Sequence, residues 1–175
     1  MKKVSILYFY ICLFIISYIL INGISIYGDD AVNIKLTGSL IDRIIYRYKV
    51  WDTRIVSQIF MYELTIQNLI IFKIIFSLFN VLFVYSLCKI CKLNLSIDFL
   101  IYGSSLVFLF PFEIMKSAGW IATFTNYYFP SVCCIASLSI YIDIFDNKIN
   151  KIQYFFLFYC FYMPQITSKQ QLLAC

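Results

Sequence analysis

Long apolar runs separated by short polar segments dominate this chain of 175 residues. The first run, from Val4 to Ile26, contains no charged residue. A helix needs about 20 such residues to cross the hydrocarbon core of a bilayer. The pattern predicts an all-α integral membrane protein, a single membrane domain over residues 1–175 with about five transmembrane helices. These are expected at 4–26, 69–87, 99–112, 127–144 and 152–163.

Composition supports a membrane protein and excludes two other classes. Hydrophobic residues make up 62% of the chain and charged residues only 13%, whereas soluble domains carry about 25% charged residues. The net charge of +5 does not indicate nucleic-acid binding, because the basic residues are scattered between the apolar runs. The chain is therefore expected to have the lipid bilayer as a partner and no nucleic acid.

The first run is interpreted as a membrane anchor and not as a cleaved signal peptide. Its apolar stretch is too long for the hydrophobic region of a signal peptide and ends at Asn22-Gly23 without a small-residue cleavage site. Lysines at alternate helix ends predict a cytoplasmic amino terminus. The opposing observation is the long first loop, which is also basic. The lysines at these alternate helix ends are Lys2, Lys3, Lys89, Lys92, Lys148 and Lys151.

Residues 27–67 form the expected first external loop, and 39–60 within it have the period of an amphipathic helix. Such a helix is expected to lie flat on the membrane. Arg43, Arg47 and Arg54 share one face of it, away from the apolar stripe that includes Trp51. Two interpretations stay open: the arginines contact lipid phosphates, or they form an anion site for a phosphate-bearing substrate.

Two adjacent carboxylates, Asp29 and Asp30, follow the first apolar run directly. Carboxylates are costly in hydrocarbon, so the pair is expected at the water interface or in a wet cavity, where ionisable residues are functional candidates. The second external loop, 113–126, is rich in hydroxyl, amide and aromatic groups that suit a sugar ring, above all Trp120, Thr123 and Asn126. An ordinary aromatic belt at the interface is the competing explanation.

Seven cysteines and no histidine are present. Most cysteines lie inside apolar runs, where they act as small hydrophobes. Cys88 and Cys91 have zinc or redox spacing, but no second pair accompanies them. No metal site is predicted from them, and the odd count does not indicate a disulfide framework.

Three elements resemble bacterial multi-pass membrane proteins of the GT-C glycosyltransferase class, in particular a branch that modifies or builds cell-surface polysaccharides. They are the acidic pair Asp29-Asp30, a W-x-x-R element ending the external helix, and a run from Trp120 through Asn126 to Pro130. The W-x-x-R element is Trp51-Asp52-Thr53-Arg54. The chain departs from that branch at Thr53, where glycine is expected, and at Phe129, where tryptophan is expected.

The resemblance implies transfer of a sugar from a polyprenyl-phosphate carrier to a glycan or lipid acceptor at the outer face of a bacterial plasma membrane. Asp29 or Asp30 would be the general base. The pair also suits a divalent cation, and no other cofactor is implied. The arginines would hold the phosphate leaving group, and Trp51 and Trp120 would line the sugar or lipid path.

The length of the chain leads to a further expectation and to two alternatives. Enzymes of this class are usually longer, so the chain is interpreted as an amino-terminal fragment of a GT-C-like module. One alternative is a small non-enzymatic multi-pass membrane protein. The other is a fragment of a lipid-linked sugar transporter or flippase, which would favour charges inside the helices near the midplane.

Overall fold

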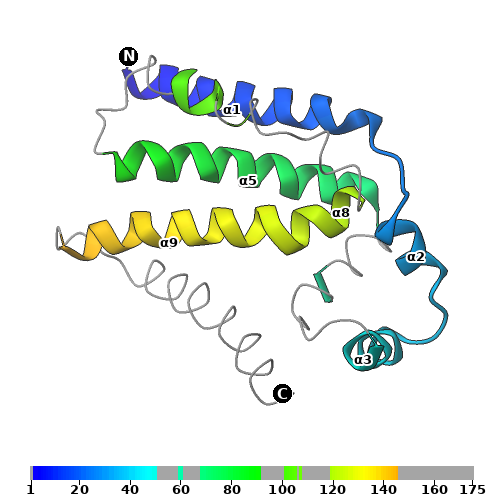
Figure 1. Cartoon of the computed structure of the whole chain (residues 1–175). Helices are drawn as coiled ribbons and strands as arrows, with labels where there is room; N and C mark the ends of the chain where they lie inside the picture. Colours follow the sequence, from blue (N-terminus) through cyan, green and yellow to red (C-terminus); the bar gives the residue numbers. More distant parts are fainter. Residues whose placement is uncertain are drawn as a thin grey trace.

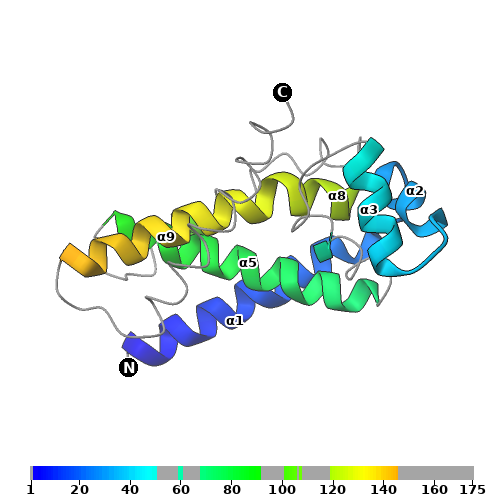
Figure 2. The same ribbon diagram turned by 90° about the horizontal axis from the view of Figure 1, so that it is seen from below.

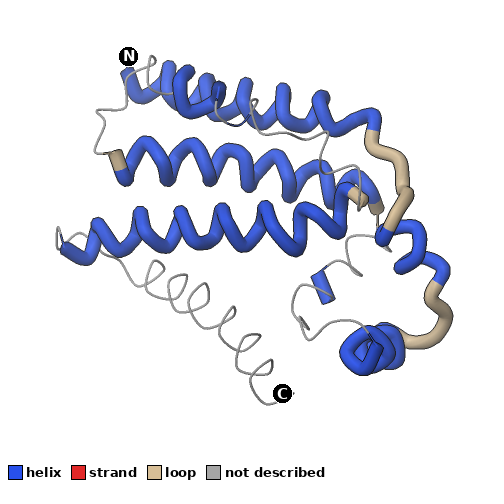
Figure 3. The backbone as a smooth tube through the Cα atoms, in the orientation of Figure 1, coloured by secondary structure: helices blue, strands red, loops and turns tan. Residues whose placement is uncertain are grey.

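The computed structural model describes residues 2–50, 59–60, 68–91, 101–105, 107 and 119–145. Within these residues every regular element is a helix, as Figure 3 shows. The prediction of an all-helical chain is therefore confirmed for the part that the structure describes.

Three helical stretches among the described residues are long and apolar enough to cross a membrane: Ser5–Gly23, Leu69–Ile90 and Trp120–Phe145. They correspond to the first, second and fourth predicted segments. The last one begins seven residues earlier than predicted, at Trp120 instead of 127. The third and fifth predicted segments lie largely or wholly outside the described residues, so the number of about five spans stays a prediction.

The three stretches pack side by side (Figures 1 and 2). Helix α1 (Lys2–Leu20) continues into a short 3₁₀ helix, η1 (Ile21–Gly23). It runs antiparallel to α5 (Leu69–Ile90), since the Tyr10 ring lies 6.4 Å from that of Tyr85 while Asn22 bonds to Lys73. The third stretch runs parallel to α5 and consists of α8 (Trp120–Thr123), the π-helix η2 (Phe124–Tyr128) and α9 (Phe129–Phe145).

The carboxyl end of the first stretch and the amino ends of the other two lie together at one end of this bundle. We call it the loop end and define it by residues 21–23, 68–73 and 119–128. Two short helices, α2 (Asp29–Lys35) and α3 (Leu40–Val50), lie beyond it in Figure 1. The acidic pair and the start of α8 therefore meet at the same end of the bundle, although 91 residues separate Asp30 from Ile121.

Aromatic side chains from α5 and η2 fill the core near the loop end. The rings of Phe72 and Phe124 meet edge to face at 5.4 Å, and those of Phe76 and Tyr128 stack at 5.7 Å. Offset and edge-to-face pairs of this kind add to the stabilisation from buried area. The Tyr128 hydroxyl donates a hydrogen bond to Asn80 Oδ1, so both buried polar groups are paired. This cluster fixes the third stretch against α5.

The π-helix η2 follows from the proline that comes directly after it. Pro130 has no amide hydrogen and cannot donate to the carbonyl of Asn126, as a residue in a regular α-helix would. The helix widens by one residue per turn here, so that the amide of Phe129 donates to the carbonyl of Phe124, five residues earlier. The Thr125 hydroxyl donates to the carbonyl of Ile121 at 2.9 Å and so satisfies another backbone acceptor in this turn.

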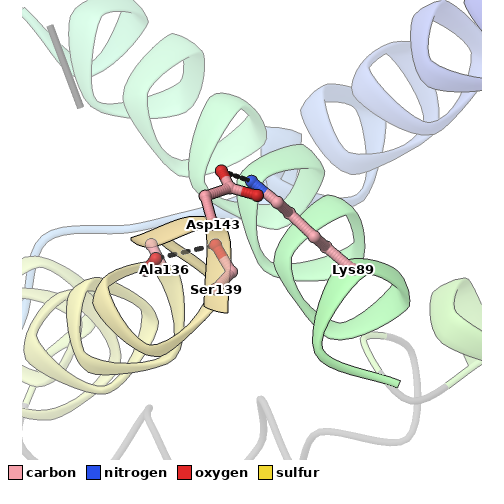
Figure 4. Close-up of polar contacts among 4 residues, drawn as sticks. All are labelled: Lys89, Ala136, Ser139 and Asp143. Atoms are coloured by element: carbon pink, nitrogen blue, oxygen red, sulfur yellow. Dashed lines mark hydrogen bonds and ion pairs between the residues drawn. The ribbon is translucent and has the colours of Figure 1, made fainter. Parts of the chain in front are cut away.

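At the opposite end of the bundle, Lys89 of α5 forms an ion pair with Asp143 of α9 (Figure 4). Both side chains are largely buried, with 21% and 12% of their surfaces exposed. Removing one member of a buried pair leaves an uncompensated charge, which is far more costly than the pair itself is stabilising.

We therefore expect Asp143→Leu to lower the unfolding free energy by about 3 kcal/mol. The measurement is unfolding of the purified protein in mixed micelles, followed by circular dichroism. The reversed pair, Lys89→Asp with Asp143→Lys, should recover part of the loss. Lys35→Met, which removes an exposed lysine from α2, is the control and should change little. Equal stability of Asp143→Leu and the wild type would contradict the stabilising role of the pair.

Candidate functional site

Asp30 connects the first loop to the start of the third membrane stretch. It lies in the first turn of α2 and is fully buried. Its Oδ2 accepts a hydrogen bond from the amide of Ile121 at 3.0 Å, and its Oδ1 accepts one from the amide of Ala122 at 2.8 Å. The first amides of a helix have no partner within the helix and carry partial positive charge. Asp30 thus caps α8 from a distant part of the chain.

Gly119 makes this close approach possible. Its φ of +104° lies in the region that favours glycine. A Cβ atom placed there would lie 2.8 Å from the Asp30 carboxylate and 2.9 Å from the carbonyl oxygen of Tyr27. Both the backbone angle and the available space therefore require glycine. We call this arrangement the latch and define it by Tyr27, Asp30, Gly119, Ile121 and Ala122.

The environment of the latch shifts the acid–base behaviour of Asp30. Burial raises the pKa of its carboxyl group above the ordinary value of 3.8, because the charged form is removed from water. The hydrogen bonds from the amides of Ile121 and Ala122 act in the opposite direction and lower the pKa. The neighbouring charge of Asp29 adds to the rise. Burial outweighs the hydrogen bonds, so the net pKa is raised.

The two carboxylates of the acidic pair are placed differently. Asp29 is partly exposed, whereas Asp30 is buried with both oxygens bonded to backbone amides. Adjacent residues in a helix point about 100° apart, which explains how one side chain faces the latch and the other does not. Of the two predicted catalytic residues, Asp29 is the one with access to a ligand from outside.

Trp120, Thr123 and Asn126, predicted to lie in a loop, lie instead in α8 and η2 at the same end of the bundle. Trp120 is half-buried in the first turn of α8, directly after the latch glycine. The Thr123 hydroxyl donates to the carbonyl of Gly119 at 2.8 Å. The Oδ1 atom of Asn126 is buried and has no hydrogen-bond partner among the described residues. These three predicted residues therefore lie in the same helical segment as Ile121 and Ala122, whose amides donate to Asp30.

Of the three arginines predicted to share a face, only Arg43 has a described side chain. Helix α3 covers the first half of the predicted amphipathic range and is capped by Ser39, whose hydroxyl accepts from the amide of Asp42 at 3.2 Å. Hydrogen bonds from the Ser39 hydroxyl and amide lower the pKa of the exposed Asp42 carboxyl. Arg43 is half-buried on α3. The side chain of Arg47 lies outside the described residues, as do Trp51 and Arg54 entirely, so their grouping stays a prediction.

Cys88 and Cys91 are both free thiols at the end of α5, Cys88 buried and Cys91 exposed. Within the described part of the chain, no group of three or more histidine, cysteine, aspartate or glutamate side chains could hold a metal ion. The sequence also suggests a divalent cation at the acidic pair Asp29-Asp30. Both oxygens of Asp30 are already engaged by amides, which leaves Asp29 as the member of the pair with coordination capacity.

The sequence did not identify the other members of the latch. Gly119 and Tyr27 fall within the predicted loops 113–126 and 27–67, and nothing in the pattern of apolar and polar positions separates them from the other loop residues. The available signal was a glycine directly before an apolar helix start, which is typical of a special backbone angle. That signal names no partner, and the partner here lies about 90 residues away.

Comparison with models of protein families, with curated proteins and with solved structures found no match to this chain.

Proposed function

We propose that the chain is a membrane glycosyltransferase-like protein that uses a polyprenyl-phosphate-linked sugar as donor and a glycan or lipid hydroxyl as acceptor. The observation that carries the proposal is the latch. By burying Asp30 against the start of α8, it holds the partly exposed Asp29 near a loop end that also carries Trp120 and Asn126. A carboxylate beside aromatic and amide groups is a suitable arrangement for a sugar hydroxyl.

In this proposal Asp29 is the general base and Asp30 is a positioning residue. The acceptor oxygen forms a bond to the anomeric carbon while the bond from that carbon to the phosphate oxygen breaks. Asp29 takes the proton of the acceptor hydroxyl, and polyprenyl phosphate leaves with the electron pair. Arg43, with Arg47 and Arg54, stabilises the charge of the leaving phosphate. Trp51 and Trp120 line the path of the sugar or the lipid.

The loop end is proposed to face the outside of a bacterial plasma membrane, with the amino terminus in the cytoplasm. The short lysine-bearing turns support this orientation. The described helix ends agree with this orientation: the start of α1 and the end of α5 lie opposite α2 (Figure 1), and Lys89 is in the last turn of α5.

A small non-enzymatic membrane protein is the second candidate. The engagement of both Asp30 oxygens by backbone amides favours it, since half of the acidic pair then has a structural role. Under this candidate Asp29 would be an ordinary polar residue at the interface.

Substitution of Asp29 separates the two candidates. Purified protein in proteoliposomes is given a radiolabelled polyprenyl-phosphate hexose, and release of the sugar from the lipid is measured with and without a glycan acceptor. The transferase proposal expects Asp29→Asn to lower the rate at least about 100-fold, because the amide cannot accept the proton. Asp29→Glu should retain part of the activity.

Asp42→Asn is the matched control, since it removes an exposed carboxylate from the neighbouring helix α3. It should keep the rate of the wild type. A wild-type protein that releases no sugar under any of these conditions, or an Asp29→Asn variant as active as the wild type, would exclude Asp29 as the base. In the first case the non-enzymatic candidate is favoured.

A further inference from the structure

Helix α5 carries two lysines within its apolar stretch, Lys73 and Lys89, and their side chains have different kinds of partner. Lys89 has a carboxylate partner, Asp143 of α9. Lys73 instead donates to the neutral Oδ1 of Asn22 at 2.8 Å and lies 5.9 Å from the centre of the Tyr18 ring. Among the described residues no carboxylate lies in ion-pair contact with Lys73. The positive charge of Lys73 is therefore oriented by its neighbours but not neutralised by them.

The position of Lys73 corresponds to the headgroup region of a bilayer. Asn22 is the last residue but one of the first membrane stretch, Ser5–Gly23, and Lys73 is the fifth residue of the second, Leu69–Ile90. Around Lys73 the surface of α5 is apolar and open, with Ile70 50% exposed and Ile74 39% exposed. A lysine in such a place extends along apolar surface so that its ammonium group reaches the interface.

The dipole of α5 adds to the positive potential around this ammonium group. Lys73 lies near the amino terminus of α5, where the helix dipole is also positive and a cation is unfavourable. Asn68 caps this terminus: its side chain accepts from the amide of Ile70 at 3.0 Å, and its carbonyl oxygen accepts from the amides of Ile71 and Phe72. An ammonium group has three donors, and the hydrogen bond to Asn22 uses one. Donors and positive potential thus remain for an anion at this depth.

We propose that Lys73, oriented by Asn22 and Tyr18, binds the phosphate of an anionic phospholipid headgroup between α1 and α5 at the loop end. A single lysine near an anionic membrane surface contributes about 1 kcal/mol of attraction to such headgroups. The acyl chains would lie along the exposed apolar face beside Ile70 and Ile74. The site is independent of the transferase proposal, because a bound bilayer lipid requires no catalysis.

The test uses the full chain, purified in a neutral detergent and titrated with phosphatidylglycerol or phosphatidylcholine. Bound lipid is counted by native mass spectrometry, and the unfolding midpoint is followed in parallel. The wild type should prefer phosphatidylglycerol. Lys73→Gln should weaken phosphatidylglycerol binding about five- to tenfold, because one interfacial charge is lost. Lys73→Arg should retain binding.

Two further variants make the test specific to the charge. Asn22→Asp places a carboxylate against Lys73, so the cation gains an internal partner and phosphatidylglycerol binding should fall although the lysine is present. Lys35→Gln removes an exposed lysine of α2 and should leave binding unchanged.

Equal binding of the two lipids by the wild type, or unchanged phosphatidylglycerol binding in Lys73→Gln, would overturn the inference. The phosphate at this site could come from a phospholipid or from the sugar carrier, and titration with polyprenyl phosphate distinguishes the two. If polyprenyl phosphate displaces phosphatidylglycerol from the wild type and Lys73→Gln loses its binding as well, the phosphate belongs to the sugar carrier, and the assignment to a phospholipid is wrong. A wild-type protein that binds phosphatidylglycerol through Lys73 but shows no transferase activity would support the lipid site and not the transferase proposal.

Discussion

Replacement of Asp30 by alanine is expected to lower the unfolding free energy by about 3 kcal/mol. The substitution removes both hydrogen bonds to the amides of Ile121 and Ala122, and these buried donors are left without an acceptor. Unfolding in mixed micelles, followed by circular dichroism, measures the loss. Limited proteolysis next to residue 119 should also become faster, because the start of α8 is no longer held.

Two further variants test whether the loss of stability in Asp30→Ala comes from its buried hydrogen bonds. Asp30→Asn keeps one carbonyl acceptor and should be less destabilising than Asp30→Ala. Asp42→Asn also changes a capping carboxylate, but an exposed one, and should cost less than about 1 kcal/mol. An Asp30→Ala protein as stable as Asp42→Asn would contradict the structural role of the latch.

The raised pKa of Asp30 gives this contribution a pH dependence. The folded protein binds the proton of this carboxyl group more tightly than the unfolded chain does. Stability from this group is therefore greatest below the ordinary value of 3.8 and declines as the pH rises through the raised folded pKa. The stability difference between wild type and Asp30→Asn should shrink over that range. A difference that instead grows with pH would mean that the amide hydrogen bonds outweigh burial.

Gly119→Ala is expected to be as disruptive as the loss of Asp30, by about 3 kcal/mol, although it adds a single methyl group. The added Cβ atom would lie 2.8 Å from the Asp30 carboxylate, and the φ of +104° is strained for any L side chain. The carboxylate and the start of α8 must move apart. Thermal unfolding of the purified variant in detergent gives the measurement.

Gly23→Ala is the matched control for this substitution. Gly23 also lies at the loop end, but a Cβ atom there would meet nothing within 4 Å. Its change in stability should stay within about 0.5 kcal/mol. If both alanine variants unfold at the same temperature, the close contact between Gly119 and Asp30 does not stabilise the protein. Combining Gly119→Ala with Asp30→Ala should cost less than the sum of the single losses, because both act on one contact.

The sequence was sufficient for the elements whose cause is local. Apolar runs of membrane length predicted the stretches that begin near Val4 and Leu69, because burial in lipid depends on composition over about 20 residues. The start of the third stretch was misplaced at Tyr127. The polar residues between Trp120 and Asn126 resembled a loop, while in the structure their hydroxyl groups bond to backbone carbonyls of the helix itself.

The candidate site shows where sequence reasoning stops. Asp29 and Asp30 are adjacent and chemically identical, so no local rule distinguishes the one that is buried from the one that is partly exposed. The distinction comes from α8, which is remote in sequence and supplies the amides that Asp30 accepts from. Lys73 and Lys89 are likewise similar in sequence context, and only the packing of α1 and α9 against α5 shows that their partners differ.

The latch also fixes an order of events during synthesis. Asp30 leaves the ribosome about 90 residues before the amides that it binds. Until Ile121 and Ala122 have been made and have reached the loop end, the carboxylate lacks these amide partners and must stay hydrated. Helices α1 and α5 can pair before that moment, but α2 gains its place only when α8 arrives. A ribosome stalled before residue 119 should therefore carry a chain whose first loop is still open to protease.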